Sequence, residues 1–473
     1  MCSAGGDLIG LLATHEGGVR VINGSGAAPR AIAPAAEGWS RMPFDGPHTV
    51  TVPGVVAAWQ AMHELGASKP WSTLIDPAVR LAVDGVPVAG SLASAIVDNS
   101  SRIAADRGLR EVLMPDGVPL LKGTVLRQPA LARSLARIAD GGPVALYGGE
   151  VGNELVTCLT GLGSTIGIDD LRTHRTEVCE PIGLGIGGCE VLTAPPNSQG
   201  LLLLQTLAAL EELGPGDYLG ADAGLLGDLF RLAASDRDRH LGDPRFSPVR
   251  VEELLSRERA AQLAATARDG QTGAVEAEGF SGSSSGDTIA LVTADSSGNG
   301  AVVVQSVFAA FGAGILDPAS GIVCHNRGAF FSLDPGSPNV LEGGKRPTHT
   351  LMPVMVRQEG RIVGLQGTMG GPAQPQIHAQ VLLRMRAGVD PAQAVAAPRW
   401  VVAEPAAGAI GRDAYAEADL EPAATDGLRA AGFAVHPLPP RSEFVGHAQV
   451  IRRSGGELSA AADPRADGAA GAG

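Results

Sequence analysis

Two short stretches in the second half of the chain hold residue types that could together perform acyl transfer. A Ser/Gly-rich tract, Gly279–Gly286, ends at Asp287-Thr288, and a β-branched run continues from Thr288 to Thr293. If the Asp287–Thr288 peptide bond were cut, Thr288 would carry a free α-amine, whose ordinary pKa of about 7.7 to 8.0 makes it a usable base at neutral pH. One residue would then supply both a nucleophilic hydroxyl and its base.

A glycine pair supplies the second component of such a site. Gly370 and Gly371 stand between a predicted strand, Arg361–Leu365, and a predicted helix, Pro375–Arg386. Because glycine has no Cβ, these N–H groups can approach a reacting carbonyl closely, and the helix start adds partial positive charge where an oxyanion would form. The pair therefore predicts an oxyanion hole. On composition alone, a simple turn here and a Thr288 that merely opens a strand remain the alternative.

The elements that must position these residues change in kind at Thr288. After it, two β-branched runs, Thr288–Thr293 and Ala301–Val307, predict a buried hairpin joined by Asp295–Gly300. Before it, the pattern is mainly helical, and Asp76-Pro77 indicates one helix start. Apolar residues three and four apart predict further helices over Gly54–Leu65, Gln128–Ala139, Leu201–Leu213, Ala221–Ala234 and Val251–Arg268.

Three other motifs lack the context that their chemistry needs. Gly183–Gly188 satisfies GxGxxG, but Glu180-Pro181 precedes it where a strand should run, which disfavours a dinucleotide site. Gly282–Gly286 satisfies GxSxG around Ser284, yet it leads into a strand rather than a helix, which disfavours a nucleophile elbow. The charge-dense stretch Asp236–Asp243 interleaves Asp with Arg, which predicts ion pairing at a helix end rather than catalysis.

Composition excludes several classes of protein. The 36 Lys and Arg against 50 Asp and Glu give a net charge of −14, and only 4% of residues are aromatic, so binding of nucleic acid or anionic lipid is disfavoured. Five scattered Cys without a CxxC pair support neither a disulfide framework nor a zinc site. No apolar run approaches a membrane span, and residues 1–7 do not read as a leader, so we expect a cytoplasmic protein. No metal or other cofactor is predicted.

Many short stretches, in order and over nearly the whole chain, resemble the γ-glutamyltransferase family of N-terminal-nucleophile hydrolases. The matching stretches are Val52-Pro53-Gly54, Leu74–Val88, Pro195–Gly200, Asp236–Pro244, Asp287-Thr288, Lys345-Arg346-Pro347, Gly367–Gly371, Ala397-Pro398-Arg399 and Asp463-Pro464-Arg465. The resemblance implies self-cleavage between Asp287 and Thr288, with Gly370 and Gly371 as oxyanion glycines. It also implies that the Ser306 hydroxyl orients the Thr288 amine or Oγ.

The same resemblance implies an α+β fold, a four-layer αββα sandwich. A helix-rich large-subunit region, residues 1–287, and a small-subunit region, residues 288–473, would build this fold together. The mature enzyme would form an acyl-Thr288 intermediate with a small-molecule amide and pass the acyl group to water or an amine. Its partners would be its own two fragments; a homo-oligomer is left open.

The substrate clamp departs from that of true γ-glutamyl transferases. The position of their carboxylate-binding Arg is Ser25, that of their amine-binding Asp is Phe330, and their serine pair is His349-Thr350. The stretches around Arg327, His349 and Thr350 are similar instead to the branch that contains oxamate amidohydrolase. We therefore expect Arg327 and His349 to orient a small carboxylate, with Thr350 beside them.

Two rival interpretations stay open at this point. One is a glutathione hydrolase or γ-glutamyl transpeptidase with a rearranged clamp, and the other is an uncleaved, non-catalytic binding scaffold. In addition, relatives carry a helix with a Gly-Gly-Asn-Ala segment before the region that matches Ser3–Asp7. Its absence is consistent with a late start codon, an incomplete chain or an inactive relative.

Overall fold

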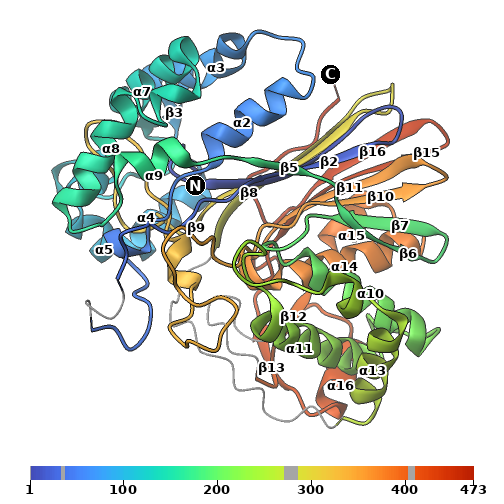
Figure 1. Ribbon diagram of the computed structural model, residues 1–473. Helices are drawn as coiled ribbons and strands as arrows, with labels where there is room; N and C mark the ends of the chain where they lie inside the picture. The colour runs from blue at the N-terminus through green and yellow to red at the C-terminus, as the bar shows by residue number, and fades with distance from the viewer. Residues whose placement is uncertain (1, 34–37, 271–285, 403–410, 473) are drawn as a thin grey trace.

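Two antiparallel sheets stack face to face at the centre of the computed structural model, and helices cover both outer faces (Figure 1). The structure describes residues 2–33, 38–270, 286–402 and 411–472. The order of layers is helices, sheet, sheet, helices, which is the four-layer αββα sandwich of an α+β protein.

The first sheet has five strands and places β1 and β9 near its middle. Its order is β5 (Glu177–Cys179), β2 (Val19–Gly24), β1 (Asp7–Ala13), β9 (Gly300–Ala309) and β8 (Gly286–Ala294). One helical layer packs on its outer face through a core that includes Leu8 and Ile22 of the sheet. The helices of this end of the molecule are α2 (Val55–Glu64), α3 (Trp71–Asp84), α4 (Gly90–Asp98), α5 (Ser100–Ala105), α6 (Arg107–Leu113), α7 (Pro129–Gly141), α8 (Glu150–Gly161) and α9 (Ile168–Thr173).

The second sheet has six strands in the order β16 (Glu457–Ala462), β15 (His447–Ser454), β11 (Arg361–Met369), β10 (Val354–Gln358), β7 (Cys189–Thr193) and β6 (Ile182–Ile186). The helices of its layer are α10 (Gly200–Leu213), α11 (Ala223–His240), α12 (Val251–Leu254), α13 (Arg257–Arg268), α14 (Gln374–Arg386), α15 (Pro391–Ala396) and α16 (Pro422–Ala430). Two small sheets complete the described chain: β12 (Trp400–Val402), β13 (Asp413–Glu417) and β14 (Ala434–Leu438), and the pair β3 (Val86–Pro87) and β4 (Val125–Leu126).

The core between the two sheets is built from alternate residues of the strands, because successive side chains of a strand point to opposite faces. Ile9 and Leu11 of β1 and Val304 of β9 point inward, and they meet Met355 and Leu365 of the second sheet. The residues between them point to the helical layer instead. The inner faces are therefore mainly apolar, and a polar side chain in the same rows needs hydrogen-bond partners inside the core.

Both sheets take strands from both sides of the Asp287–Thr288 bond. In the first sheet, β1 pairs with β9 from Asp7↔Ser306 to Ala13↔Gly300. In the second sheet, β7 pairs with β10. The regions 1–287 and 288–473 thus share their sheets in the structure.

The predicted elements are present, with three differences. The helix predicted over Val251–Arg268 is two helices, because the Ser256 hydroxyl accepts from the Arg259 N–H and caps a new start. The helix predicted to start at Asp76 begins at Trp71, so its Pro lies inside it. The hairpin is only half-buried, since Ile289 and Leu291 are 51% and 54% exposed.

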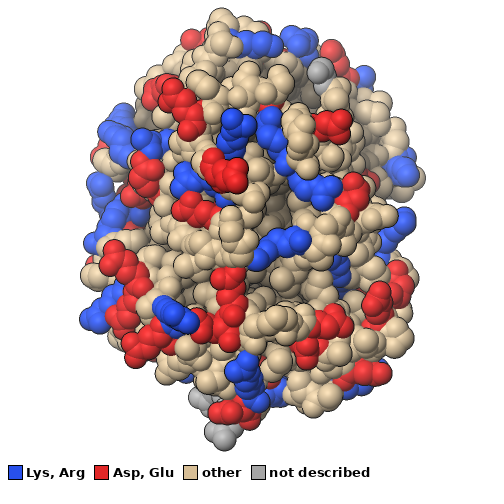
Figure 2. Space-filling model, turned by 90° about the vertical axis from the view of Figure 1, so that its right-hand side faces the viewer, with Lys and Arg blue, Asp and Glu red and all other residues tan. Residues whose placement is uncertain are grey.

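The surface has no single dominant sign of charge on the face drawn in Figure 2, where acidic and basic side chains are interspersed. All five cysteines are free thiols. Among the helices of the described residues, none is both long and apolar enough to cross a bilayer.

Candidate active site

Thr288 is the third residue of β8 and lies opposite Ser306 of β9. Its Oγ1 donates a hydrogen bond to Ser306 Oγ at 2.9 Å, and the Phe308 N–H donates to the same oxygen at 2.8 Å. The hairpin therefore brings together the threonine and the serine that the sequence singles out. The Ser306 hydroxyl is held by the backbone of its own strand while it contacts Thr288.

The ladder between β8 and β9 is irregular at the bond predicted to be cut. Asp287 pairs with Phe308, whereas Thr288 pairs with Ser306, so Val307 is an extra residue in β9. Such a bulge bends the strand and re-aims its side chains. Phe308 has φ 75°, a left-handed value that is rare for a bulky residue, so this stretch of backbone is strained.

A buried carboxylate lies in the same cross-strand row. Asp7 of β1 is the partner of Ser306, which puts Asp7, Ser306 and Thr288 side by side on the inner face of the first sheet. The Asp7 carboxylate is 1% exposed and accepts from the Gly26 and Gly54 N–H groups at 3.2 and 3.3 Å. Burial raises its pKa, but the neighbouring histidines outweigh this effect and hold the pKa well below its usual range.

Gly370 and Gly371 follow β11, and two close approaches between the sheets show where that strand leads. A Cβ built on Gly300 would lie 2.7 Å from Leu365, and one built on Gly367 would lie 2.9 Å from the Ala290 Cβ. The chain of β11 thus runs from the turn of the β8–β9 hairpin toward its Thr288 end. The glycine pair continues in that direction.

The backbone at the pair requires glycine. Gly371 has φ 54°, and a Cβ on Gly370 would collide with Ile377 of α14. Gly371 begins a 3-10 turn, η5 (Gly371–Ala373), directly before α14. Because the first N–H groups of a helical segment have no partner inside it, those of the glycine pair are suited to an incoming oxyanion.

Arg327 is a buried cation whose hydrogen bonds are incomplete. It begins the 3-10 turn η4 (Arg327–Phe330), is 1% exposed, and places its guanidinium 3.9 Å from the centre of the Phe308 ring. Its Nη2 donates to Thr350 Oγ1 at 2.8 Å, but its Nε and Nη1 find no partner among the described residues. Burial lowers its pKa to about 9. A buried charge in this state is unfavourable, and an anion that bonds both nitrogens would relieve it.

His349 has a different setting from Arg327, because both of its ring nitrogens already have protein partners. Nδ1 accepts from the Leu351 N–H at 3.2 Å, which leaves the proton on Nε2, and Nε2 donates to Asp7 Oδ2 at 3.1 Å. Burial and the nearby Arg327 lower its pKa to about 4. His349 is thus a neutral member of the Asp7 network. Arg327 is the group of the two with free donors for a carboxylate.

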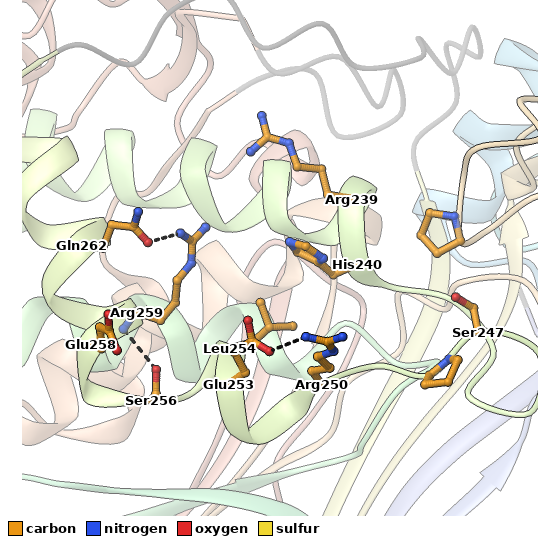
Figure 3. Close-up of a pocket in the computed structure, with 12 residues that line it drawn as sticks. Arg239, His240, Ser247, Arg250, Glu253, Leu254, Ser256, Glu258, Arg259 and Gln262 are labelled. Carbon is orange, nitrogen blue, oxygen red and sulfur yellow. Dashed lines mark hydrogen bonds and ion pairs between the residues drawn. The ribbon is translucent and has the colours of Figure 1, made fainter.

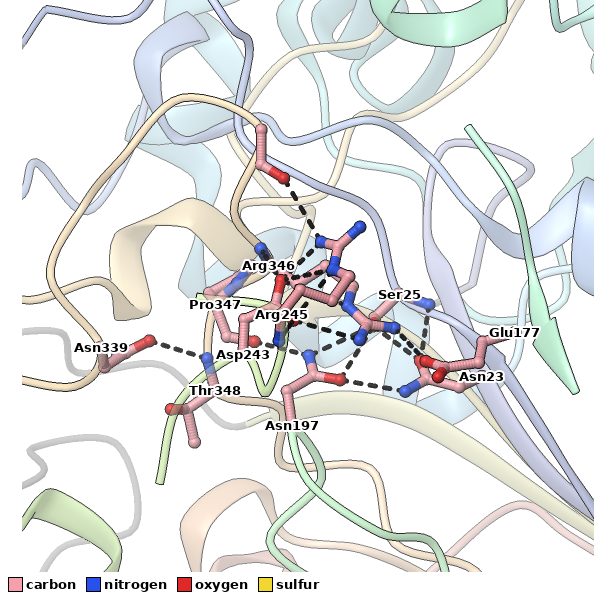
Figure 4. Close-up of polar contacts among 11 residues, drawn as sticks. Asn23, Ser25, Glu177, Asn197, Asp243, Arg245, Asn339, Arg346, Pro347 and Thr348 are labelled. Carbon is pink, nitrogen blue, oxygen red and sulfur yellow. Dashed lines mark hydrogen bonds and ion pairs between the residues drawn. The ribbon is translucent and has the colours of Figure 1, made fainter. Parts of the chain in front are cut away.

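The segment that carries His349 and Thr350 is held in place by a dense polar network (Figure 4). Asp243 accepts from the Arg346 N–H at 2.8 Å, and Arg346 also forms an ion pair with Glu177. The Asn197 side chain donates to the Pro347 carbonyl at 2.7 Å, and the Asn339 side chain accepts from the Thr348 N–H at 2.8 Å. These contacts fix the segment from both sides.

The positions that differ from a glutamyl clamp are uncharged in this structure. The Ser25 hydroxyl is buried and bonds to Asn23 Oδ1 at 2.6 Å. The Phe330 ring meets the Phe308 ring edge to face at 5.9 Å, and the Arg327 guanidinium lies 5.5 Å from its centre. An amino-acid ammonium group would therefore meet apolar surface and a cation here, rather than a carboxylate.

The GxGxxG motif is not part of this site. Gly183–Gly188 forms β6 and its turn into β7, so it is a hairpin. Ser284, with most of the tract Gly279–Gly286, lies outside the described residues. No group of three or more His, Cys, Asp or Glu within the described ranges is placed to hold a metal ion.

The charge-dense end of α11 is ion-paired, as its pattern predicts. Arg237 pairs with Asp238, and Arg259 of α13 pairs with Asp236. A pocket of about 610 Å³ lies beside this helix end (Figure 3). Arg250 and Glu253, which line it, form an ion pair with each other, and none of the predicted site residues lines it.

Two residues of the site were not given a role from the sequence. Asp7 stands in a glycine-rich stretch whose partner strand lies almost three hundred residues away, so only pairing with β9 reveals it. Gln199 precedes α10, and its amide contacts both Thr350 and Gly371. Gln199 lies in the stretch Pro195–Gly200, which matches the family, but no local sequence pattern predicts which residues its side chain contacts.

Comparison with known proteins identifies relatives over nearly the whole chain. The family model described as Gamma-glutamyltranspeptidase matches residues 1–473. The glutathione hydrolase-like YwrD proenzyme of Bacillus subtilis (strain 168) is 33% identical over 485 residues, covering 99% of this chain and 90% of the relative. The oxamate amidohydrolase proenzyme of Klebsiella pneumoniae is 33% identical over 481 residues, with the same coverage. The crystal structure of cephalosporin acylase from Bacillus halodurans superposes with a TM-score of 0.88 at 29% identity, over 98% of this chain and 86% of that one.

The fold and these relatives define an amidohydrolase or acyltransferase of the N-terminal-nucleophile type. The chain belongs to the gamma-glutamyltranspeptidase family.

Proposed function

We propose that this protein cuts its own chain before Thr288 and then hydrolyses a small, carboxylate-bearing amide through an acyl-Thr288 intermediate. The contact that supports the nucleophile is the hydrogen bond from Thr288 Oγ1 to Ser306. The observation that carries the substrate class is the buried Arg327 guanidinium with two nitrogens that lack partners among the described residues.

Activation needs one attack and one hydrolysis. Thr288 Oγ attacks the carbonyl carbon of Asp287, the peptide C–N bond breaks as the acyl group moves from nitrogen to oxygen, and the hydroxyl proton passes to the released nitrogen. Water then cleaves the ester, which leaves a carboxylate on Asp287 and a free amine on Thr288. The bulge at Val307 and the strained Phe308 lie opposite this bond, where they hold the two reacting residues out of regular strand geometry.

Turnover uses the new amine as the base. It takes the proton of Oγ while Oγ attacks the substrate carbonyl, and the N–H groups of Gly370 and Gly371 stabilise the oxyanion. The protonated amine next gives its proton to the leaving nitrogen, and the acyl-Thr288 ester forms. Water, activated by the same amine, releases the acid. Arg327 holds the substrate carboxylate throughout, and Ser306 keeps the Thr288 hydroxyl in place.

The amide that fits this description best is oxamate-like, because a single carboxylate can satisfy Arg327, and the position of the family's amine-binding Asp is the apolar Phe330 beside the Arg327 guanidinium. The similarity to oxamate amidohydrolase supports the same substrate class.

Two measurements test this function. Intact mass spectrometry of the purified protein should show fragments that end at Asp287 and begin at Thr288, and the Thr288→Ala variant should stay one chain. The cleaved protein should hydrolyse oxamate faster than a γ-glutamyl anilide. An uncleaved wild type would favour a binding scaffold, whereas rapid glutamyl turnover would favour a glutathione hydrolase.

A further inference from the structure

Gln199 connects the two halves of the site described above. Its side chain is fully buried, and its Nε2 donates to the Thr350 carbonyl and to the Gly371 carbonyl, each at 3.0 Å. Thr350 is also the residue whose hydroxyl holds Arg327. One amide group thus bridges the segment beside the anion-binding cation and the glycine pair.

These contacts fix which end of the Gln199 amide is which. Both partners are backbone carbonyls, and carbonyls only accept, so the NH2 group must face them. Both amide hydrogens are then used. The other end, Oε1, is buried and receives no hydrogen bond from the described part of the chain. A buried acceptor in this state is as unusual as a buried donor without an acceptor.

Arg327, with donors that lack a partner in the described part of the chain, and Gln199, with an acceptor that lacks one, therefore both contact Thr350. Arg327 contacts the Thr350 hydroxyl, and Gln199 contacts the Thr350 carbonyl. Among the described residues, two guanidinium nitrogens of Arg327 and the Oε1 of Gln199 have no partner. A carboxylate satisfies the first group, and an N–H satisfies the second. Because both residues contact Thr350, one ligand that carries both groups is the simplest partner for the two.

We propose that Gln199 is a specificity residue whose Oε1 accepts the N–H of the substrate amide while Arg327 holds the carboxylate. This inference rests on the proposed function and narrows its substrates to amides that keep an N–H within a few bonds of the carboxylate. No bond to Gln199 is made or broken in the reaction. The contact orients the plane of the amide, and the Nε2 contact with the Gly371 carbonyl sets the glycine pair against the same plane.

A comparison of an amide with its ester separates this role from a structural one. Oxamate and monomethyl oxalate carry the same carboxylate, but the ester has no N–H. We would measure kcat/KM for both compounds with the cleaved wild type and with Gln199→Met, which keeps the side-chain volume. Loss of the bridge to Thr350 and Gly371 should lower both values. Loss of the acceptor should lower only the amide value, so the amide-to-ester ratio should fall by about three- to tenfold, the effect of one hydrogen bond.

The outcomes are distinct. An unchanged ratio in a folded, cleaved Gln199→Met protein would overturn the inference and leave the proposed function intact. Turnover of neither compound by the cleaved wild type would overturn the proposed function, and this inference with it.

A second measurement decides the matter if Gln199→Met fails to fold or to cleave itself. The wild type is assayed with oxamate, N-methyloxamate and N,N-dimethyloxamate, which carry two, one and no amide N–H groups. The inference predicts a small loss of kcat/KM at the first methyl group and a loss of about tenfold more at the second, where the last N–H disappears. Equal losses at both steps would point to bulk alone and overturn it.

Discussion

At the scale of single residues, the proposed site differs from the rest of the core in holding a buried arginine that forms no ion pair with a described residue. Arg399 illustrates the contrast, because it is fully buried but pairs with Asp463 at 2.6 Å. Arg327 is equally buried, but among the described residues its guanidinium bonds to a hydroxyl and stacks on the Phe308 ring, without a carboxylate partner. Burial of a charge is tolerated when pairing offsets the lost solvation, which is why we propose Arg327 as the group that binds the substrate carboxylate.

This contrast predicts opposite effects of the same substitution at the two arginines. Arg327→Met should raise the free energy of unfolding of the ligand-free protein by about 1 kcal/mol, because it removes a buried charge that forms no ion pair with a described residue, and the Met side chain keeps apolar contact with the Phe308 ring. The matched control Arg399→Met should lower it by about 3 kcal/mol, because it leaves Asp463 without its closest cation. Urea unfolding in a Thr288→Ala background, where unfolding involves one chain, measures both. A clear destabilisation by Arg327→Met would show that its charge is compensated within the fold.

The Arg327→Met variant should also lose activity. Each charge-assisted hydrogen bond to a substrate carboxylate contributes about 1.5 to 3 kcal/mol, so Arg327→Met should lower kcat/KM for oxamate by about ten- to a hundredfold. Self-cleavage should continue, since the Thr288–Ser306 hydrogen bond does not involve Arg327 and the Met side chain keeps apolar contact with the Phe308 ring. Fragment formation by mass spectrometry is therefore the control. Normal kcat/KM in the variant would remove Arg327 from substrate binding.

At the scale of elements, the position of the glycine pair depends on how closely the two sheets approach at β8 and β11. Gly367 has room for no side chain because Ala290 and Val302 face it across the interface. Any increase in bulk here must push β11 away from β8. Since β11 leads directly into Gly370, the displacement would reach the predicted oxyanion hole.

A complementary exchange tests this packing. Gly367→Ala should destabilise the protein by about 1 to 3 kcal/mol, as overpacking does, and should slow self-cleavage. Adding Ala290→Gly should restore much of the stability and of the rate of self-cleavage, because it removes a methyl group from the strand that faces residue 367. Gly185→Ala on β6, where nothing lies within 4 Å of the new Cβ, is the control and should have little effect. Equal behaviour of Gly367→Ala and Gly185→Ala would show that this contact does not position β11.

The elements also show what a sequence can and cannot predict. The hairpin, β11 and most helices follow from periodicity, because burial of one face imposes it locally. The break at Ser256 was missed because a helical pattern continues on both sides of the cap. The sequence gives no reason to treat Arg327 and His349 differently. They differ in the structure because Asp7, which β1 brings beside β9 from the other end of the chain, accepts a hydrogen bond from His349.

At the scale of the whole molecule, self-cleavage should not separate the two regions of the chain. β1 is paired with β9 along its full length, and β7 is paired with β10, so each sheet crosses the predicted boundary. Separation would expose both edges and the core between the sheets. We expect the cleaved protein to elute in gel filtration at the same volume as uncleaved Thr288→Ala, and to yield two bands only on denaturing electrophoresis. Elution of separate fragments would contradict this.

Buried histidines make the stability of the whole molecule depend on pH. His349 and His378 are each almost fully buried, and burial, the larger cause, lowers their pKa values to about 4 and about 3. In the unfolded chain both return to about 6.5. As the pH falls below that value, the unfolded state takes up protons that the folded state does not, so the folded state loses stability down to its own pKa values.

Each of the two histidines should therefore contribute a loss of about 1.4 kcal/mol per pH unit between about pH 6 and pH 4.5. In the Thr288→Ala background, His378→Gln should reduce the slope of unfolding free energy against pH by about one such contribution. If His378→Gln kept the full slope, another group would have to take up the proton on unfolding. Asp7 is not that group. Its pKa is lowered in the folded state, so it reduces stability only when the pH falls below the pKa of an ordinary carboxyl group.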